Sequence, residues 1–407
     1  MRQRRASMAF ILITLLLDVI GLGLIIPILP RLVTDLTGSG AAQAAFSYGF
    51  LVAVYALMQF IFAPVLGSLS DRFGRRPLIL IALLGLGINY LLLALAPNLT
   101  WLIVARAISG IMGASITTVN AYIADISTPQ NRARNFGLVG ATFGLGFILG
   151  PALGGILGTI SPRLPFYVAA ALALLNWLYG LLLLPESLPV DKRRPFSWRK
   201  ANPLSLLQLR LYPIVAGLAV AFVLLGLAQR GLESVWVLYT TYRFGWLELQ
   251  NGLALALVGV MAVLVQGYLL RLIISRLGER RAILLGLSIS IVAFLLYGLA
   301  YQGWMMLAVI VFTALGGIAA PVIQGLVAGA VPSSEQGQVQ GSLTSLLSLS
   351  AVIAPLISTG LFGYFTGVAP LSIPGAPFFA SALLMAGALL VMVRLFRRYP
   401  QLAAARS

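Results

Sequence analysis

Two charged residues stand inside long apolar runs of the sequence, where charge is costly. Asp18 lies in the run 11–29, and Arg106 lies in the run 100–124. A carboxylate at the centre of a bilayer costs on the order of 3 kcal/mol, so such a group is normally retained for a function such as proton transfer. We predict that Asp18 carries protons and that Arg106 couples its protonation to conformation. The structural alternatives are an Asp18 bonded to a neighbouring helix end and an Arg106 bonded to backbone carbonyls.

A second pair of charges, Arg230 and Glu233, lies one helical turn apart near the outer end of the run 212–235. At that spacing the two side chains can neutralise each other. Alternatively, Glu233 binds a proton or a cationic substrate, which would make it a third proton-coupling residue. Other polar and aromatic residues in the apolar runs either line a substrate cavity or hold helices together. The candidates for substrate binding are Tyr55, Gln59, Asn89, Asn120, Arg230, Trp236 and Gln324.

Composition places these residues in a membrane. The chain has 407 residues, of which 60% are hydrophobic and 9% charged, and its mean hydropathy is +1.00. No soluble fold of this length buries so much apolar surface. There is no cysteine and no histidine, which excludes disulfides and Cys/His metal sites. We expect no metal and no cofactor. No pair of acids at catalytic spacing occurs in a loop, so we do not expect an enzyme.

The charge distribution predicts orientation. A net charge of +17 would suggest nucleic acid in a soluble protein. Here most Lys and Arg residues fall in one alternate set of loops, and the other set holds Arg31, Arg163 and Arg243. This bias places the basic loops and both termini in the cytoplasm of a multi-pass plasma (inner) membrane protein, with no nucleic-acid partner. The first apolar run is too long for a cleaved signal peptide, so we expect it to be retained.

The apolar runs predict an all-α membrane protein with 12 transmembrane helices. Residues 1–184 would form an N-terminal six-helix bundle, residues 185–211 a cytoplasmic linker, and residues 212–407 a C-terminal six-helix bundle. The expected spans are roughly 8–30, 45–67, 77–96, 100–124, 135–158, 165–184, 212–235, 251–273, 282–301, 304–331, 339–362 and 376–396.

The two halves repeat at an offset of 204 residues. Gly74 matches Gly278, and the pair Gly150-Pro151 matches the pair Ala354-Pro355. Two parallel halves related by an axis normal to the membrane are typical of transporters with a binding site between them at the midplane. Asp18 and Arg106 have apolar counterparts in the second half, so the N-terminal half is the better candidate for ion coupling.

Two short stretches are candidates for conformational gating. A basic loop between the second and third runs combines turn-forming glycines with charge, and the fifth run spaces glycines at four-residue intervals, which permits close helix packing. An acid at the end of the fourth run completes the set. The gating candidates are Gly67, Asp71, Arg72, Gly74, Arg75, Arg76, Asp125, Gly150, Pro151, Gly154 and Gly155.

These motifs resemble the major facilitator superfamily (MFS). The pattern Gly67-x-Leu69-x-Asp71-Arg72-x-Gly74-Arg75-Arg76 is similar to the loop between its second and third helices. The arginine at 106 resembles its fourth-helix arginine, associated with proton transfer, and the stretch 146–155 resembles the fifth-helix motif of drug antiporters. Over essentially the whole chain the sequence resembles the tetracycline:proton antiporter branch, whose characteristic positions include Gln59, Asp71 and Asp125.

The resemblance implies a proton-driven antiporter that exports small amphipathic drugs by alternating access, with drug, protons and the lipid bilayer as partners and a monomer as the unit. The branch has acids in its third and ninth helices and a histidine in its eighth, where this chain has Asn89, Ser290 and Ala262. These departures count against tetracycline itself, so tetracycline-like and multidrug efflux both stay open. The alternative function is a proton-independent facilitator of a lipid, sugar or other metabolite.

Overall fold

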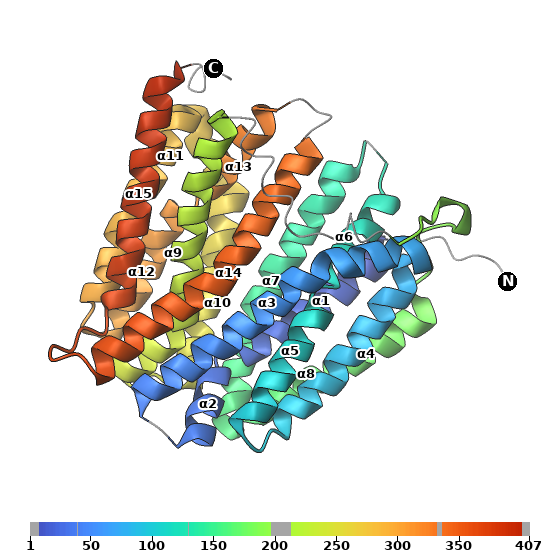
Figure 1. Ribbon diagram of the computed structural model, residues 1–407, viewed down its shortest axis with the longest axis horizontal. Coiled ribbons are helices and arrows are strands. Elements are labelled where there is room, and N and C mark those ends of the chain that lie inside the picture. The colour runs from blue at the N-terminus through green and yellow to red at the C-terminus, as the bar shows by residue number, and fades with distance from the viewer. Residues whose placement is uncertain (1–7, 39, 129, 197–212, 332–335, 401–407) are drawn as a thin grey trace. The chain divides into compact units, whose positions relative to one another are not determined.

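The computed structural model describes residues 8–38, 40–128, 130–196, 213–331 and 336–400. Within those ranges the chain consists of helices and their connections, with no strand (Figure 1). The helices that precede the predicted linker are α1 (Met8–Ile25), α2 (Leu29–Thr37), α3 (Ala41–Phe73), α4 (Arg75–Ala94), α5 (Leu99–Gly113), α6 (Ile116–Asp125), α7 (Arg132–Ile160) and α8 (Leu164–Leu183). A single 3-10 turn, η1 (Val190–Lys192), lies in the described part of the linker, and residues 197–211 of the linker lie outside the described residues.

The second half continues the same pattern. Its elements are α9 (Pro213–Phe244), α10 (Glu248–Leu264), the π-helix η3 (Val265–Leu269), α11 (Leu270–Leu299), α12 (Gly303–Gly316), α13 (Ala319–Gly329), α14 (Gln336–Gly367) and α15 (Ala376–Arg398).

Among the described residues, eleven helices are long and apolar enough to cross a membrane. One of them, Glu248–Leu299, has 52 residues and bends at Gly278, whose φ is 74°. A bilayer requires about 20 helical residues, so this element is long enough to cross twice. Counting it as two gives the predicted twelve spans. The glycine is required at the bend because a side chain at positive φ is strained.

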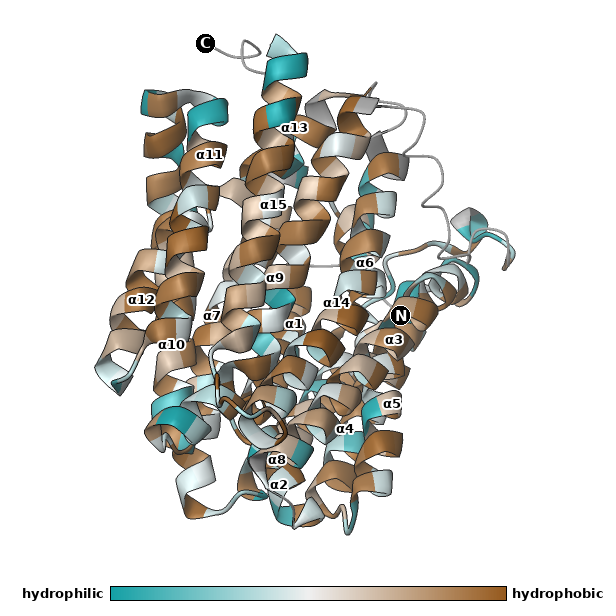
Figure 2. Cartoon of the chain, turned by 60° about the vertical axis from the view of Figure 1, so that its left-hand side comes forward, coloured by the Kyte–Doolittle hydropathy of each residue, from teal (hydrophilic) through white to brown (hydrophobic). Residues whose placement is uncertain are grey.

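The outer surfaces of these helices are apolar, as lipid requires. Figure 2 shows hydrophobic residues along most of the length of the helices. Large aliphatic side chains point outward, for example Ile160 at 72% exposure, Leu182 at 66% and Leu383 at 74%. In water such a surface would be unfavourable, whereas in hydrocarbon it costs nothing.

The repeat that the sequence predicted extends to the ends of the elements. Gly74, with a φ of 103°, precedes α4 as Gly278 precedes the second part of α11. The predicted spans 100–124 and 304–331 are each interrupted, at Ala114–Ser115 and at Gly317–Ile318. These interruptions lie at matching places of the two halves, so they belong to the repeated design. Both predicted spans are present, as Leu99–Asp125 and Gly303–Val327.

Contacts divide the chain into two compact units. Unit 1 comprises the described residues of Met1–Gly38, Val54–Pro203 and Leu247–Ala256. Unit 2 comprises those of Ser39–Ala53, Leu204–Trp246 and Leu257–Ser407. Two helices, α3 and α10, therefore begin in one unit and continue in the other. In unit 1, α1 packs against α7 and α8; in unit 2, α9 packs against α14 and α15, which are their counterparts in the repeat.

Candidate transport site

Asp18 lies on α1, two-thirds of the way along the helix, and its side chain is partly buried. Tyr90 of α4 lies against the next turn of α1. A Cβ atom placed on Gly21, one turn further along α1, would lie 3.7 Å from the Tyr90 hydroxyl oxygen. Tyr90 is itself buried, at 4% exposure. A buried aromatic side chain thus lies beside the turn of α1 that follows Asp18.

Arg106 lies on α5 and is buried, at 8% exposure. Its guanidinium carbon stands 4.4 Å from the centre of the Tyr55 ring on α3, a cation–π contact. The contact depends on Gly110, because a Cβ atom there would lie 2.8 Å from Cβ of Met58 and would overlap the backbone of Tyr55. Glycine at 110 therefore lets α3 approach α5 closely enough for the ring to cover the cation.

Two more predicted binding residues lie on the same helices of unit 1. Gln59 donates from Nε2 to the carbonyl of Gly113, one turn below Tyr55. Asn89 is fully buried and donates from Nδ2 to the Ser109 hydroxyl at 2.5 Å. Its Oδ1 has no hydrogen-bond partner among the described residues. Both amides bridge helices in this structure, and their assignment to substrate binding stays a prediction.

Asn120 on α6 and Gln324 on α13 are exposed and lie one repeat apart, 204 residues from each other. Gln324 donates from Nε2 to Oε1 of Gln340 at 3.3 Å. The two exposed amides thus occupy equivalent places of the repeat, one in each unit. Their assignment to substrate binding stays a prediction.

In unit 2, Arg230 Nη1 and Glu233 Oε2 form an ion pair at 2.8 Å on α9, with half-exposed side chains. Gln229 also donates to the Glu233 carboxylate, at 3.3 Å. The i,i+3 pairing predicted as one alternative is therefore present. Trp236, three residues on, is buried at 4% exposure and packs edge to face against Tyr297. Whether Glu233 also takes part in proton coupling stays a prediction.

The basic loop predicted at 67–76 is formed by the end of α3, Gly74 and the start of α4, and it holds a charge network. The guanidinium of Arg75 contacts Asp71 Oδ1 at 2.6 Å, Asp125 Oδ2 at 3.1 Å and the Ser70 hydroxyl at 2.6 Å. Arg75 is buried at 8% exposure, so it neutralises two acids from different helices in a partly dry place. The side chain of Arg76 donates to the carbonyl of Leu181 at 2.7 Å. The loop is tied both to α6 and to the end of α8.

Glu186, which was not among the predicted site residues, caps α4. Its carboxylate accepts hydrogen bonds from the backbone amides of Arg75 at 2.9 Å and Arg76 at 3.3 Å. A carboxylate at a helix N-terminus satisfies free N–H groups and opposes the positive end of the helix dipole. In the sequence Glu186 stands just after the predicted span 165–184, and no local pattern marks it as the cap of a helix that begins 111 residues earlier.

The glycine-rich stretch of α7 packs against α1. A Cβ atom on Gly150 would lie 2.7 Å from Cα of Gly23, and one on Gly154 would overlap the backbone of Leu24. These contacts are between backbones, so no side chain can move aside to make room. The predicted role of the fifth-helix glycines in close helix packing agrees with this geometry. Their role in gating stays a prediction.

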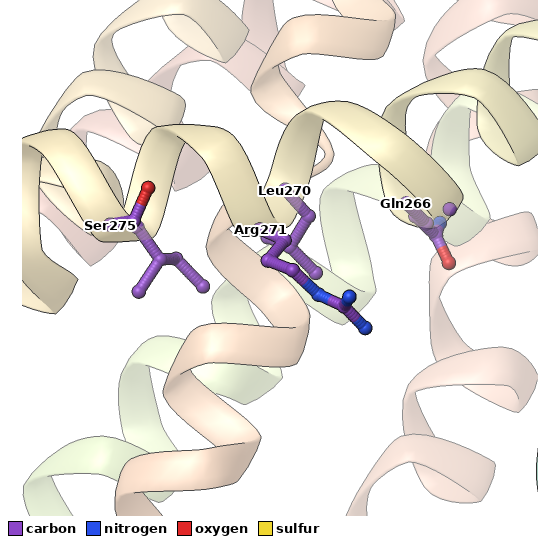
Figure 3. A pocket seen from close by; sticks show the side chains of 6 residues that line it. Gln266, Leu270, Arg271 and Ser275 are labelled. Atoms are coloured by element: carbon purple, nitrogen blue, oxygen red, sulfur yellow. The ribbon is translucent and has the colours of Figure 1, made fainter.

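One shallow groove, of about 450 Å³, lies in unit 2 and is lined by Gln266, Gly267, Leu270, Arg271, Ile274 and Ser275. Figure 3 shows that Arg271 and Gln266 extend toward the same space beside the π-helix. None of the predicted binding residues lines it. Within the described part of the chain, no cluster of three or more acidic residues could hold a metal ion.

Comparison with known proteins agrees with this architecture. The Major Facilitator Superfamily pattern matches residues 11–300 and 269–407. The chain is 42% identical over 357 residues to the class C tetracycline resistance protein of Escherichia coli, which covers 88% of this chain and 89% of that protein. It is 38% identical over 366 residues to the class G protein of Vibrio anguillarum, covering 89% and 92%.

A solved structure shares the fold over almost the whole chain. The human organic anion transporter MFSD10 superimposes with a TM-score of 0.71 at 24% identity, covering 96% of this chain and 100% of that one. The sequence pattern, the identity to curated relatives and the helical repeat all lead to one assignment. The chain belongs to the Major Facilitator Superfamily and is a membrane transporter, not an enzyme.

Proposed function

We propose that this protein is a proton-driven antiporter that exports small amphipathic drugs by alternating access, with Asp18 as the group that binds and releases the proton. The observation that carries the proposal is the 42% identity over 357 residues to the class C tetracycline resistance protein, together with a carboxylate, Asp18, inside the first membrane-spanning helix. A carboxylate at that depth is costly and is normally retained for a function, and reversible proton binding is the function proposed for it here.

The substrate class rests on the relatives. Tetracycline resistance proteins of several classes are 35 to 42% identical to this chain. A tetracycline-like or multidrug substrate is therefore the first to test, with Tyr55, Gln59, Asn120 and Gln324 as candidate contacts. Asn120 and Gln324 are both exposed amides, and a hydrogen-bonding side chain suits an amphipathic ligand better than an apolar one.

The decisive experiment is drug uptake into everted membrane vesicles energised with a proton gradient. Asp18→Asn is isosteric and cannot carry a proton, so uptake driven by the gradient should fall at least about tenfold, while Asp18→Glu should retain part of it. Asp191→Asn is the matched control, because it makes the same chemical change on an exposed carboxylate that lies in the linker, outside the spans. Wild-type rate and pH dependence in Asp18→Asn would refute the role of Asp18.

The second candidate function is a proton-independent facilitator. A protonophore separates the two, because it abolishes accumulation by an antiporter and leaves downhill flux through a facilitator unchanged. Growth-inhibition assays with structurally distinct drugs in an efflux-deficient host would identify the substrate. We further propose that the protein is a monomer in the plasma (inner) membrane with both termini in the cytoplasm. Reporter fusions to each terminus would test on which side of the membrane the termini lie.

A further inference from the structure

Glu248, the first residue of α10, is a carboxylate buried at 4% exposure, and its partner is Arg31 on α2. Arg31 Nη1 lies 2.5 Å from Glu248 Oε1, and its Nε lies 3.9 Å from Asp35 Oδ2. The two partners are 217 residues apart in sequence, and both belong to unit 1. The hydrogen bond to Glu248 raises the pKa of the Arg31 guanidinium, so Arg31 stays charged at every accessible pH.

The ion pair stands at the end of a glycine groove on α7. A Cβ atom on Gly158 would lie 2.9 Å from Cβ of Glu248, and one on Gly155 would lie 2.6 Å from the Glu248 carbonyl oxygen. From the other side, a Cβ atom on Gly252 would lie 2.9 Å from Cα of Gly155. The first turns of α10 therefore lie directly on the backbone of α7, and the ion pair fastens the start of that contact.

The repeat supplies a natural comparison. At an offset of 204 residues, Arg31 matches Val235 and Glu248 matches Ala44, and both counterparts are buried apolar residues in unit 2. The same architecture is thus built in the second unit without these charges. A buried ion pair is often no more stabilising than apolar residues of similar size, whereas removing one partner of it is costly. Stability alone therefore does not explain the ion pair. A contact between α10 and α7 that must open and close during function does explain it.

The division of α10 between the two units indicates that its contact with α7 is the one that would open. Residues 247–256 belong to unit 1, and residues from 257 onward belong to unit 2. A movement of the later turns of α10 must either bend the helix or pull its first turns off α7. Arg31 is about half-exposed, with 46% of its side chain accessible. An exposed cation can be rehydrated as the pair separates, which lowers the cost of breaking it.

We propose that Arg31 and Glu248 are positioning residues of the transport cycle, and that their ion pair latches the first turns of α10 into the Gly155–Gly158 groove of α7. Release of the latch would open the non-cytoplasmic end of unit 1. The proposal rests on the alternating-access function proposed above. In this role the ion pair shifts the populations of the conformational states of the transport cycle, and it contacts neither drug nor proton.

The chain has no cysteine, so a thiol reagent reacts only with a cysteine that a substitution introduces. Ile28 is fully buried, and its Cδ1 shares the groove at Gly158 with the Glu248 side chain. The cysteine introduced by Ile28→Cys is therefore covered while the latch is closed. A membrane-impermeant maleimide added outside intact cells should label it slowly. Labelling should become about tenfold faster when Glu248→Gln or Arg31→Gln is added, because loss of one charge shifts the population toward the released state.

Two further variants keep the test decisive. Leu247→Cys, at a residue 58% exposed, should label at the same rate in every background and controls for expression and reagent access. The swap Arg31→Glu with Glu248→Arg restores an ion pair and should return Ile28→Cys to slow labelling. Rescue by the swap would show that the pairing of the two charges, and not either side chain alone, keeps Ile28 covered. Unchanged labelling of Ile28→Cys in both single-charge variants, or equally fast labelling in the swap, would overturn the latch.

The failure of the latch and the failure of the antiporter proposal are distinguishable. Labelling requires neither drug nor a proton gradient, so it reports the latch even if the substrate is wrong. Conversely, a wild-type protein without gradient-driven uptake would refute the antiporter while the labelling pattern could still hold.

Discussion

The side-chain amide of Asn89 donates to the hydroxyl of Ser109 at 2.5 Å, in a part of unit 1 where Asn89 has no accessible surface. The bond joins α4 to α5 between residues that are 20 apart in sequence. In hydrocarbon an unmade polar contact cannot be replaced by water, so interhelical bonds of this kind hold helix faces in register. This geometry gives Asn89 a packing role in the structure as it stands.

Asn89→Ala is expected to lower the thermal stability of the purified protein in detergent, because it removes the bond and leaves the Ser109 hydroxyl without it. A net loss of about 1 kcal/mol is typical of one such bond. Ser109→Ala should give a similar loss, and the double variant should cost less than the sum. If Asn89 contacts drug instead, Asn89→Ala would raise KM with no loss of stability, and Ser109→Ala would not.

The contact between Arg106 and Tyr55 predicts different effects for losing the charge of the arginine side chain and for losing its planar shape. Arg106→Lys keeps the cation but loses the flat face that covers the ring, at a cost of about 1 kcal/mol in the contact, and should transport at a reduced rate. Arg106→Gln removes the charge and should abolish gradient-driven uptake. Tyr55→Phe preserves the ring and should behave like wild type in the same vesicle assay. Equal activity of the Lys and Gln variants would show that the cation is not needed.

Arg75 is expected to be the residue on which the charge network depends. Arg75→Gln leaves Asp71 and Asp125 without their shared cation, and loss of one partner of a buried ion pair costs about 3–5 kcal/mol. The cost here should fall below that range, since 43% of the Asp71 side chain is exposed and water can solvate it. Asp125→Asn should therefore lower the unfolding temperature more than Asp71→Asn, because only 22% of the Asp125 side chain is exposed. The reverse order would contradict this assignment of the network.

The glycines of α7 provide a matched pair for close packing. Gly154→Ala places a methyl group against the backbone of Leu24, which cannot move aside, so stability and transport should both fall. Gly140→Ala lies on the same helix with nothing within 4 Å of its Cβ position, and it should be neutral or stabilising by up to about 1 kcal/mol. Unfolding temperature and vesicle uptake of the two variants measure this. A Gly154→Ala protein as stable as Gly140→Ala would mean that α1 and α7 are farther apart.

Much of the architecture was predictable because a membrane chain must satisfy its backbone within helices and face lipid with apolar side chains. Apolar runs therefore marked the spans, and Gly278, at positive φ, marked a bend that only a glycine accommodates well. The interruptions at Ala114–Ser115 and Gly317–Ile318 lie inside two of the predicted spans and are visible only in the structure, since neither place carries a proline or a charge. Hydropathy does not register a local change of helix direction.

The sequence alone predicted which residues could carry transport chemistry: Asp18 and Arg106 stand out because charge inside an apolar run is expensive, and a repeat of 204 residues is visible in the letters. Which side chains meet became known from the folded chain. The fold brought the ring of Tyr55 to Arg106, Glu186 to the start of α4, and Arg31 to Glu248. These pairings depend on the rotation and packing of helices that are far apart in sequence, which no local periodicity encodes.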